Sequence, residues 1–159
     1  IRWGGTVRWL QMESYIYASS GVAFDAGVNA SLLDGRLTVG ATLRNSGQMQ
    51  AFKETVPSLP TTISAGLAFK PILNESPIST VAVLAFESSD AYGTVLRVGG
   101  ETGVKDITLT YGVRIGEEVT SIAGGITFRI RVVSIAYGFE VASHNLGIPH
   151  LLQVKLILT

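Results

Sequence analysis

The chain has 159 residues with 12 basic and 12 acidic side chains, no cysteine, and 47% hydrophobic against 15% charged residues. Zero formal net charge argues against a nucleic-acid binder, which needs a basic surface, and the lack of cysteine excludes disulfides, thiol nucleophiles and thiolate metal sites. The mean hydropathy of +0.38 is too high for a disordered chain, yet no apolar run is long enough for a transmembrane helix.

Apolar and polar residues alternate with period two through most of the chain, which predicts strands with one apolar and one polar face. In Thr61–Lys70, for example, Ile63 and Leu67 fall on one face and Ser64 and Gly66 on the other. Most of the predicted strands exceed the five or six residues typical of soluble strands and approach the roughly 9–11 residues of a membrane-spanning strand. In chain order, the predicted strands are Arg2–Glu13, Gly21–Leu32, Arg36–Asn45, Thr61–Lys70, Ser79–Glu87, Thr94–Lys105, Ile107–Ile115, Val119–Ile130, Arg131–Ala142 and Leu151–Thr159.

Short and long links alternate between these strands. Asp34-Gly35 predicts a tight hairpin turn, and tight turns are also expected at Lys105-Asp106 and Ile130-Arg131. Pro71–Pro77 should be a short link in this order and is somewhat long. The longer links are Ser46–Pro60, Ser88–Gly93, Gly116–Glu118 and Ser143–His150. This order is typical of an outer-membrane barrel with short periplasmic turns and longer external loops.

These patterns together predict an all-β, antiparallel up-and-down membrane β-barrel of about ten strands, forming a single domain over residues 1–159. The apolar face would contact lipid and the polar face would line the lumen, because a charge facing lipid near the midplane costs roughly 2–4 kcal/mol. Charges of both signs fall on the polar face, where they can form ion pairs. The predicted lumen-lining residues are Arg8, Asp25, Arg44, Arg97, Glu101, Arg114, Arg129, Glu140 and Lys155.

The sequence shows no catalytic, metal or cofactor pattern, so we expect a protein that is not an enzyme. His144 and His150 fall in or beside one link with few acids near them, and a structural or solvent-exposed role is expected for both. Asp25 and Glu101 would act as paired acids only if their strands brought them together; ion pairing in the lumen is the expected role.

The link Ser46–Leu59 is the candidate loop for gating or for docking a partner protein, since loops on rigid scaffolds often carry function. It carries Met49, Phe52 and Val56 among polar residues. The alternative is that these apolar side chains simply fold over the mouth of the barrel.

Several short segments of the sequence match known motifs, and they occur in a characteristic order. They are Phe24–Val28 (Asp-x-Gly), Leu43–Gly47 (Leu-x-Asn-x-Gly), Leu59–Phe69 (Leu-Pro, then Gly-Leu-Ala-Phe), Leu96–Glu101, Tyr111–Arg114, and Ile135–His150 with its Leu-Gly-x-x-His ending. In this order they resemble the PorV/PorQ group of outer-membrane β-barrels, relatives of the FadL fatty-acid channels. Leu43–Gly47 corresponds to a strand end in that group.

The resemblance implies a bacterial outer-membrane protein with an accessory, partner-binding role in protein secretion or surface attachment, or one that passes hydrophobic small molecules. Its partners would be the lipid bilayer and secretion-system or surface proteins. Members of the group have some fourteen strands, so the chain would be the carboxyl-terminal part of such a barrel or a shortened relative. Leu158-Thr159 lacks the usual terminal aromatic residue.

Two alternatives remain open at this point. In the first, barrel-like subunits pack through their apolar faces and self-assemble into an extracellular filament or other structure. In the second, the strands form a soluble β-sandwich. An exposed apolar belt must be covered by lipid, detergent or protein, so solubility without detergent would distinguish these alternatives from a membrane barrel.

Overall fold

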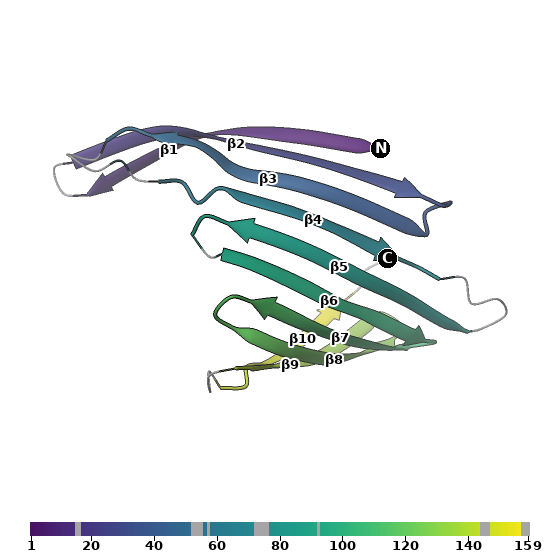
Figure 1. The fold of residues 1–159 in the computed structure, drawn as a ribbon. Helices are drawn as coiled ribbons and strands as arrows, with labels where there is room; N and C mark the ends of the chain where they lie inside the picture. Colours follow the sequence, from purple (N-terminus) through teal and green to yellow (C-terminus); the bar gives the residue numbers. More distant parts are fainter. Residues whose placement is uncertain are drawn as a thin grey trace.

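The computed structural model describes residues 1–14, 17–51, 56, 58–71, 77–91, 93–143 and 147–156, and these residues form strands and links with no helix. The strands form one sheet in chain order, each antiparallel to its neighbours (Figure 1). The predicted all-β, up-and-down arrangement of ten strands is confirmed. The strands are β1 (Arg2–Ser14), β2 (Tyr17–Leu32), β3 (Leu37–Met49), β4 (Thr62–Phe69), β5 (Ile78–Ser89), β6 (Gly93–Val104), β7 (Ile107–Gly116), β8 (Thr120–Ile130), β9 (Val133–Ala142) and β10 (His150–Leu156).

The apolar face of the sheet is more exposed than the polar face, which is the reverse of the arrangement in a soluble protein. In β4 the side chains of Ile63, Leu67 and Phe69 are exposed, whereas Thr62 is buried and Ser64 is half-buried. Residues directly opposite each other on neighbouring strands share a face, so the strand register extends this division across all ten strands. The sheet therefore has an exposed apolar face and a more enclosed polar face.

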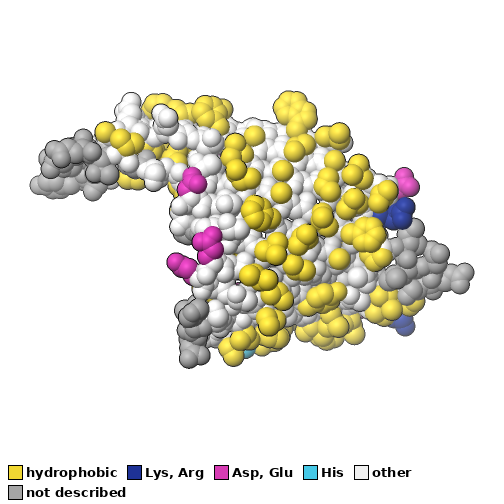
Figure 2. All heavy atoms as spheres, viewed as in Figure 1, with side chains coloured by type: hydrophobic (Ala, Val, Ile, Leu, Met, Phe, Trp, Pro, Cys, Tyr) yellow, Lys and Arg dark blue, Asp and Glu magenta, His cyan; other side chains and the backbone are white. Residues whose placement is uncertain are grey.

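The sheet is curled, with β7–β10 turning away from the plane of β3–β6 (Figure 1). Figure 2 shows hydrophobic side chains spread over the face that is turned toward the viewer across the middle of the sheet. Side chains converge on the inside of a curl, and the half-buried side chains belong to the polar face. The polar face is thus the concave one and the apolar face the convex one.

Directly opposed glycines allow neighbouring strands to approach closely on the concave face. Gly99 lies opposite Gly112, and a Cβ atom added at Gly99 would lie 2.6 Å from the Tyr111 carbonyl oxygen and 3.1 Å from the Gly112 Cα. Three further glycine pairs face each other on the same side of the sheet: Gly4 with Gly27, Gly40 with Gly66, and Gly125 with Gly138. Glycine within a strand marks such close approaches.

The sheet is open, so the described strands do not by themselves close into a barrel. Across the described strands, β1 pairs only with β2 and β10 only with β9. Closure requires hydrogen bonds between the first and last strands, and among the described residues none joins β1 to β10. The single sheet also differs from a β-sandwich, which packs two sheets face to face.

The buried residues form a small patch on the concave face and not a central core. The patch lies near the strand ends that are joined by the links at residues 50–61, 90–92 and 117–119. Ser19 donates a hydrogen bond of 2.7 Å to the Gln50 carbonyl, and the hydroxyls of Thr62 and Ser89 are 3.2 Å apart. The buried residues among those described are Ser19, Gly21, Ala23, Met49, Thr62, Ser89, Val95 and Ser121.

β3 does not end at Asn45, as predicted, but continues to Met49. The register against β2 shifts opposite Asp25, and Asn45 adopts a left-handed backbone conformation with φ 56°. This is a β-bulge, in which one extra residue is accommodated and pairing resumes beyond it. Phe24 then pairs with Ser46 and Gly21 with Met49, so β2 also begins earlier than predicted, at Tyr17.

The tight turns are confirmed. Links of two residues join β6 to β7 at 105–106 and β8 to β9 at 131–132. At the Asp-Gly turn, Leu33, Asp34 and Gly35 all have positive φ, and the Gly35 N–H donates to the Leu32 carbonyl at 3.1 Å. The last predicted strand begins at His150, and residues 157–159 lie outside the described residues.

Candidate functional site on the concave face

The concave face collects the charges that the alternation placed on polar positions. In β1, for example, Arg8 lies opposite Ala23, on the same face as Asp25, and in β10 Lys155 lies opposite Ser134. The register places all nine predicted residues on this face: Arg8, Asp25, Arg44, Arg97, Glu101, Arg114, Arg129, Glu140 and Lys155.

The first charged cluster joins β1, β2 and the bulge of β3. Arg8 Nη2 donates to Asp25 Oδ1 at 2.8 Å and to Asn45 Oδ1 at 2.5 Å. Asp25 Oδ1 also accepts the Asn45 N–H at 2.8 Å, while the Asn45 side-chain amide donates to the Pro60 carbonyl at 3.3 Å. Asp25 is therefore fully engaged in a structural network and is not paired with Glu101.

The second charged cluster centres on Glu87 of β5. Glu87 accepts Arg44 at 3.2 Å from one side and Arg97 at 3.4 Å from the other, and Ser64 also donates to it at 3.4 Å. The four residues come from β3, β4, β5 and β6, so one carboxylate links four consecutive strands. Side-chain exposures of 53% for Arg44 and 44% for Arg97 leave both arginines accessible to solvent, which limits what either pair contributes to stability.

Sequence reasoning missed Glu87 as the centre of this cluster. On the concave face, β5 presents Val81, Val83 and Ala85 before Glu87, so the polar face of this strand is itself apolar over most of its length. The alternation signal is weak here, and only the neighbouring arginines on β3 and β6 identify Glu87. The role of Asn45 in the first cluster is not predicted for a different reason, because the sequence pattern places the end of a strand at this residue.

A hollow of about 400 Å³ lies on the concave face between β5 and β9. It brings together four of the predicted residues, namely Arg97, Glu101, Arg114 and Glu140, around a floor of small residues. Among the described residues, Glu101, Arg114, Arg129, Glu140 and Lys155 form no ion pair or side-chain hydrogen bond. These charges are therefore available to a ligand in a way that those of the two clusters are not.

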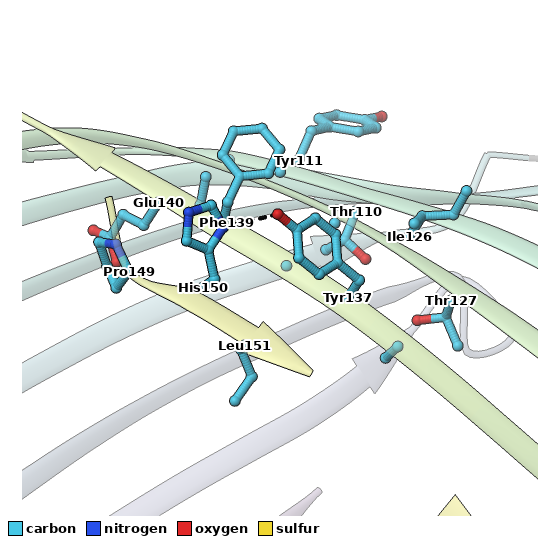
Figure 3. A pocket seen from close by; sticks show the side chains of 16 residues that line it. Thr110, Tyr111, Ile126, Thr127, Tyr137, Phe139, Glu140, Pro149, His150 and Leu151 are labelled. Atoms are coloured by element: carbon cyan, nitrogen blue, oxygen red, sulfur yellow. Dashed lines mark hydrogen bonds between the residues drawn. The ribbon is translucent and has the colours of Figure 1, made fainter. Parts of the chain in front are cut away.

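A second hollow, of about 590 Å³, lies at β7–β10 (Figure 3). Figure 3 shows the Tyr137 hydroxyl directed at His150, with 2.8 Å between Tyr137 Oη and His150 Nδ1, and the two rings stack at 6.0 Å. His150 therefore joins β10 to β9. His144 lies outside the described residues, and no group of three potential metal-ligating side chains occurs within them.

The predicted docking loop is only partly described. Met49 does not belong to it: it ends β3 and is buried at 7% exposure against Gly21. Val56 is 60% exposed, and Phe52 lies outside the described residues. The candidate loop thus begins after Met49, and of the two remaining predicted residues, Phe52 and Val56, only Val56 belongs to the described residues.

Comparison with models of protein families, with curated proteins and with solved structures finds no match for this chain. Over the described residues, no helix is both long and apolar enough to span a membrane. What the protein does must therefore be inferred from the faces, edges and hollows of the sheet.

Proposed function

We propose that the chain forms part of the wall of a bacterial outer-membrane β-barrel, with its convex apolar face against lipid and its concave polar face toward the lumen. One observation carries the proposal: the apolar side chains are on the outside of the curl and the polar ones on the inside. Outer-membrane barrels divide their side chains in the same way.

The energetics of burial support the same assignment. Among the described residues, the only buried hydrophobic residues are Ala23, Met49 and Val95, while Leu67, Val98 and other large side chains along the convex face are exposed. Burial of one such side chain contributes about 1.5–3 kcal/mol. A sheet with a whole apolar face exposed must have that face shielded from water, and lipid acyl chains can shield it.

The role we propose is non-enzymatic. It is an accessory, partner-binding role in protein secretion or surface attachment, or the passage of hydrophobic small molecules, as the resemblance to the PorV/PorQ group suggests. Charges of both signs on the concave face favour these roles over an ion-selective pore, which would carry rings of one sign.

The two tryptophans allow a direct test of lipid contact. Trp3 and Trp9 are the only tryptophans in the chain, and both lie on the convex face of β1 with exposures of 85% and 69%. In vesicles of phosphatidylcholine brominated along the acyl chains, their fluorescence should be strongly quenched relative to unbrominated vesicles. The variant Trp9→Phe isolates Trp3, and Trp3→Phe isolates Trp9. A detergent-free monomer with unquenched tryptophans would refute the proposal.

A second candidate function is self-assembly into an extracellular structure, and the open edges favour it. β1 and β10 both present an unpaired edge in the described part of the chain, and such edges are templates for pairing with another chain. A polymer that is soluble without detergent supports this candidate. A heat-modifiable monomer that is extracted only by detergent supports the barrel.

A further inference from the structure

One row of the concave face places two arginines and a serine side by side. Arg97 of β6 lies directly opposite Arg114 of β7, and Arg114 lies directly opposite Ser121 of β8. Directly opposed residues have Cβ atoms about 4.5–5.5 Å apart. All three residues line the hollow of about 400 Å³, so their side chains share one wall of it.

Two of the three polar side chains of this row, those of Arg114 and Ser121, have no acceptor among the described residues. Ser121 is only 3% exposed, yet its hydroxyl forms no hydrogen bond there, and the half-buried Arg114 forms no ion pair. Arg97 has one carboxylate partner, Glu87, which it shares with Arg44. Like charges directly opposed on a sheet repel. The Ser121 hydroxyl stays accessible, because no buried side-chain nitrogen or oxygen of the described residues lacks a hydrogen-bond partner, and it can donate to a ligand in the hollow. These features of the row favour the binding of an anionic ligand.

We propose that Arg97, Arg114 and Ser121 bind a phosphate group. Arg44, Arg97 and Arg114 carry three positive charges against one negative charge on Glu87, so this part of the face has a local excess of two positive charges, while Glu101 and Glu140 lie in other rows of the same hollow. A phosphate monoester carries about −1.5 to −2 at neutral pH, whereas a carboxylate carries a single charge. Guanidinium groups pair with phosphate through parallel N–H donors, and the Ser121 hydroxyl adds a donor.

The rest of the hollow restricts where the phosphate can lie. Glu101 and Glu140 also line it in other rows of the sheet. Glu140 lies in the row of Gly99 and Gly112, next to the arginine row, and Glu101 lies opposite Thr110 in the row beyond. The two carboxylates repel an anion from their side of the hollow and suit an ammonium group in the same ligand. Two sources share this chemistry: free inorganic phosphate and a small phosphate monoester that also carries an ammonium group, such as phosphoethanolamine. Neither depends on what covers the convex face.

Phosphate titration of the full chain in a nonionic detergent tests the site. Inorganic phosphate should bind saturably, as followed by ³¹P NMR at constant ionic strength and pH. Arg114→Gln should weaken binding about tenfold or more and Ser121→Ala about fivefold, as loss of a charged and a neutral hydrogen bond implies. The control Arg129→Gln removes a concave-face charge of β8 that lies outside the hollow, and it should change binding by less than about twofold.

Three outcomes would overturn the site: no saturable binding, equal weakening by Arg129→Gln and Arg114→Gln, or equally tight binding of acetate. If Arg114→Gln does not fold by circular dichroism, Ser121→Ala and Arg114→Lys carry the test, and the lysine variant should bind with intermediate affinity. Tighter binding of phosphoethanolamine than of phosphate identifies an ammonium-bearing phosphate monoester as the source, and equal binding identifies free phosphate. Absence of phosphate binding would not change the tryptophan quenching by brominated lipid, so the phosphate site and the barrel proposal are tested independently.

Discussion

Arg8 of β1 donates a 2.8 Å hydrogen bond to Asp25 Oδ1 of β2, and the same oxygen accepts the backbone N–H of Asn45 in β3. One carboxylate oxygen thus holds three strands at the point where the ladder between β2 and β3 is interrupted. The bulge exposes an N–H that the ladder leaves unpaired, and Asp25 replaces the missing acceptor. The Arg8–Asp25 pair is therefore part of how β3 continues past Asn45.

Removal of the Asp25 carboxylate should destabilise this junction. Asp25→Ala removes the acceptor of both Arg8 and the Asn45 N–H, whereas Asp25→Asn keeps an oxygen that can still accept. Asp25→Ala should therefore lower the midpoint of thermal unfolding more than Asp25→Asn, as followed by circular dichroism. Glu118→Ala, in the link after β7, serves as the control. Equal midpoints for Asp25→Ala and the wild type would show that the junction does not depend on this carboxylate.

The bulge itself should tolerate glycine better than alanine. Asn45 has φ 56°, a left-handed conformation that costs an alanine roughly 1 kcal/mol and a glycine almost nothing. Both Asn45→Gly and Asn45→Ala lose the side-chain bonds to Arg8 and the Pro60 carbonyl, so their difference isolates the backbone term. Urea unfolding should place the alanine variant about 1 kcal/mol below the glycine variant. Equal stabilities would argue against the left-handed conformation.

The same bulge explains where prediction from the sequence stopped. Period-two alternation is a sound guide to strands such as β4 and β7, because each residue type matches the exposure of its face. An extra residue at Asn45 shifts the register against β2, and beyond it Ser46 and Gln48 occupy convex positions opposite Phe24 and Val22. Polar residues on the apolar face remove the alternation, so the pattern predicts the end of the strand at Asn45, four residues early.

The candidate site was predictable to the extent that it depends on each strand alone. Placement on the concave face follows from alternation within a strand, and this holds for Arg97, Arg114 and Glu140. Which of these residues meet depends on the register between strands, which a single sequence does not specify. The Arg97–Arg114–Ser121 row and the role of Glu87 emerge only from that register. Closure of the sheet likewise depends on partners for its edge strands.

Gly99 of β6, which lies opposite Gly112 of β7, should be intolerant of even a methyl group. A Cβ atom at Gly99 would lie 2.6 Å from the Tyr111 carbonyl oxygen, so the backbones must shift in Gly99→Ala. Gly138→Ala is the matched control, because its Cβ would meet nothing closer than the Gly124 carbonyl oxygen at 3.6 Å. Overpacking of this kind costs about 1–3 kcal/mol. Urea unfolding should show this loss for Gly99→Ala only, and a similar loss in both variants would contradict the close approach.

Opposite faces of β7 should respond differently to a charge if the convex face contacts lipid. Val113 lies on that face in the central row with Val98 and Leu84, and Thr110 lies on the concave face opposite Glu101. In a bilayer, Val113→Arg should cost roughly 2–4 kcal/mol, the price of a basic side chain near the midplane. Thr110→Arg should cost little, because its side chain faces polar neighbours. The measurement is urea unfolding of both variants in phospholipid vesicles.

The paired design also separates a lipid-covered face from one exposed to water. If the convex face were solvated, Val113→Arg would be an ordinary surface substitution, and its effect would stay within about 0.5 kcal/mol, like that of Thr110→Arg. If a second copy of the chain covered it, Val113→Arg would instead dissociate the assembly in detergent-free buffer. A large loss in vesicles for Val113→Arg alone, with a monomer in detergent, is expected only where acyl chains contact this face.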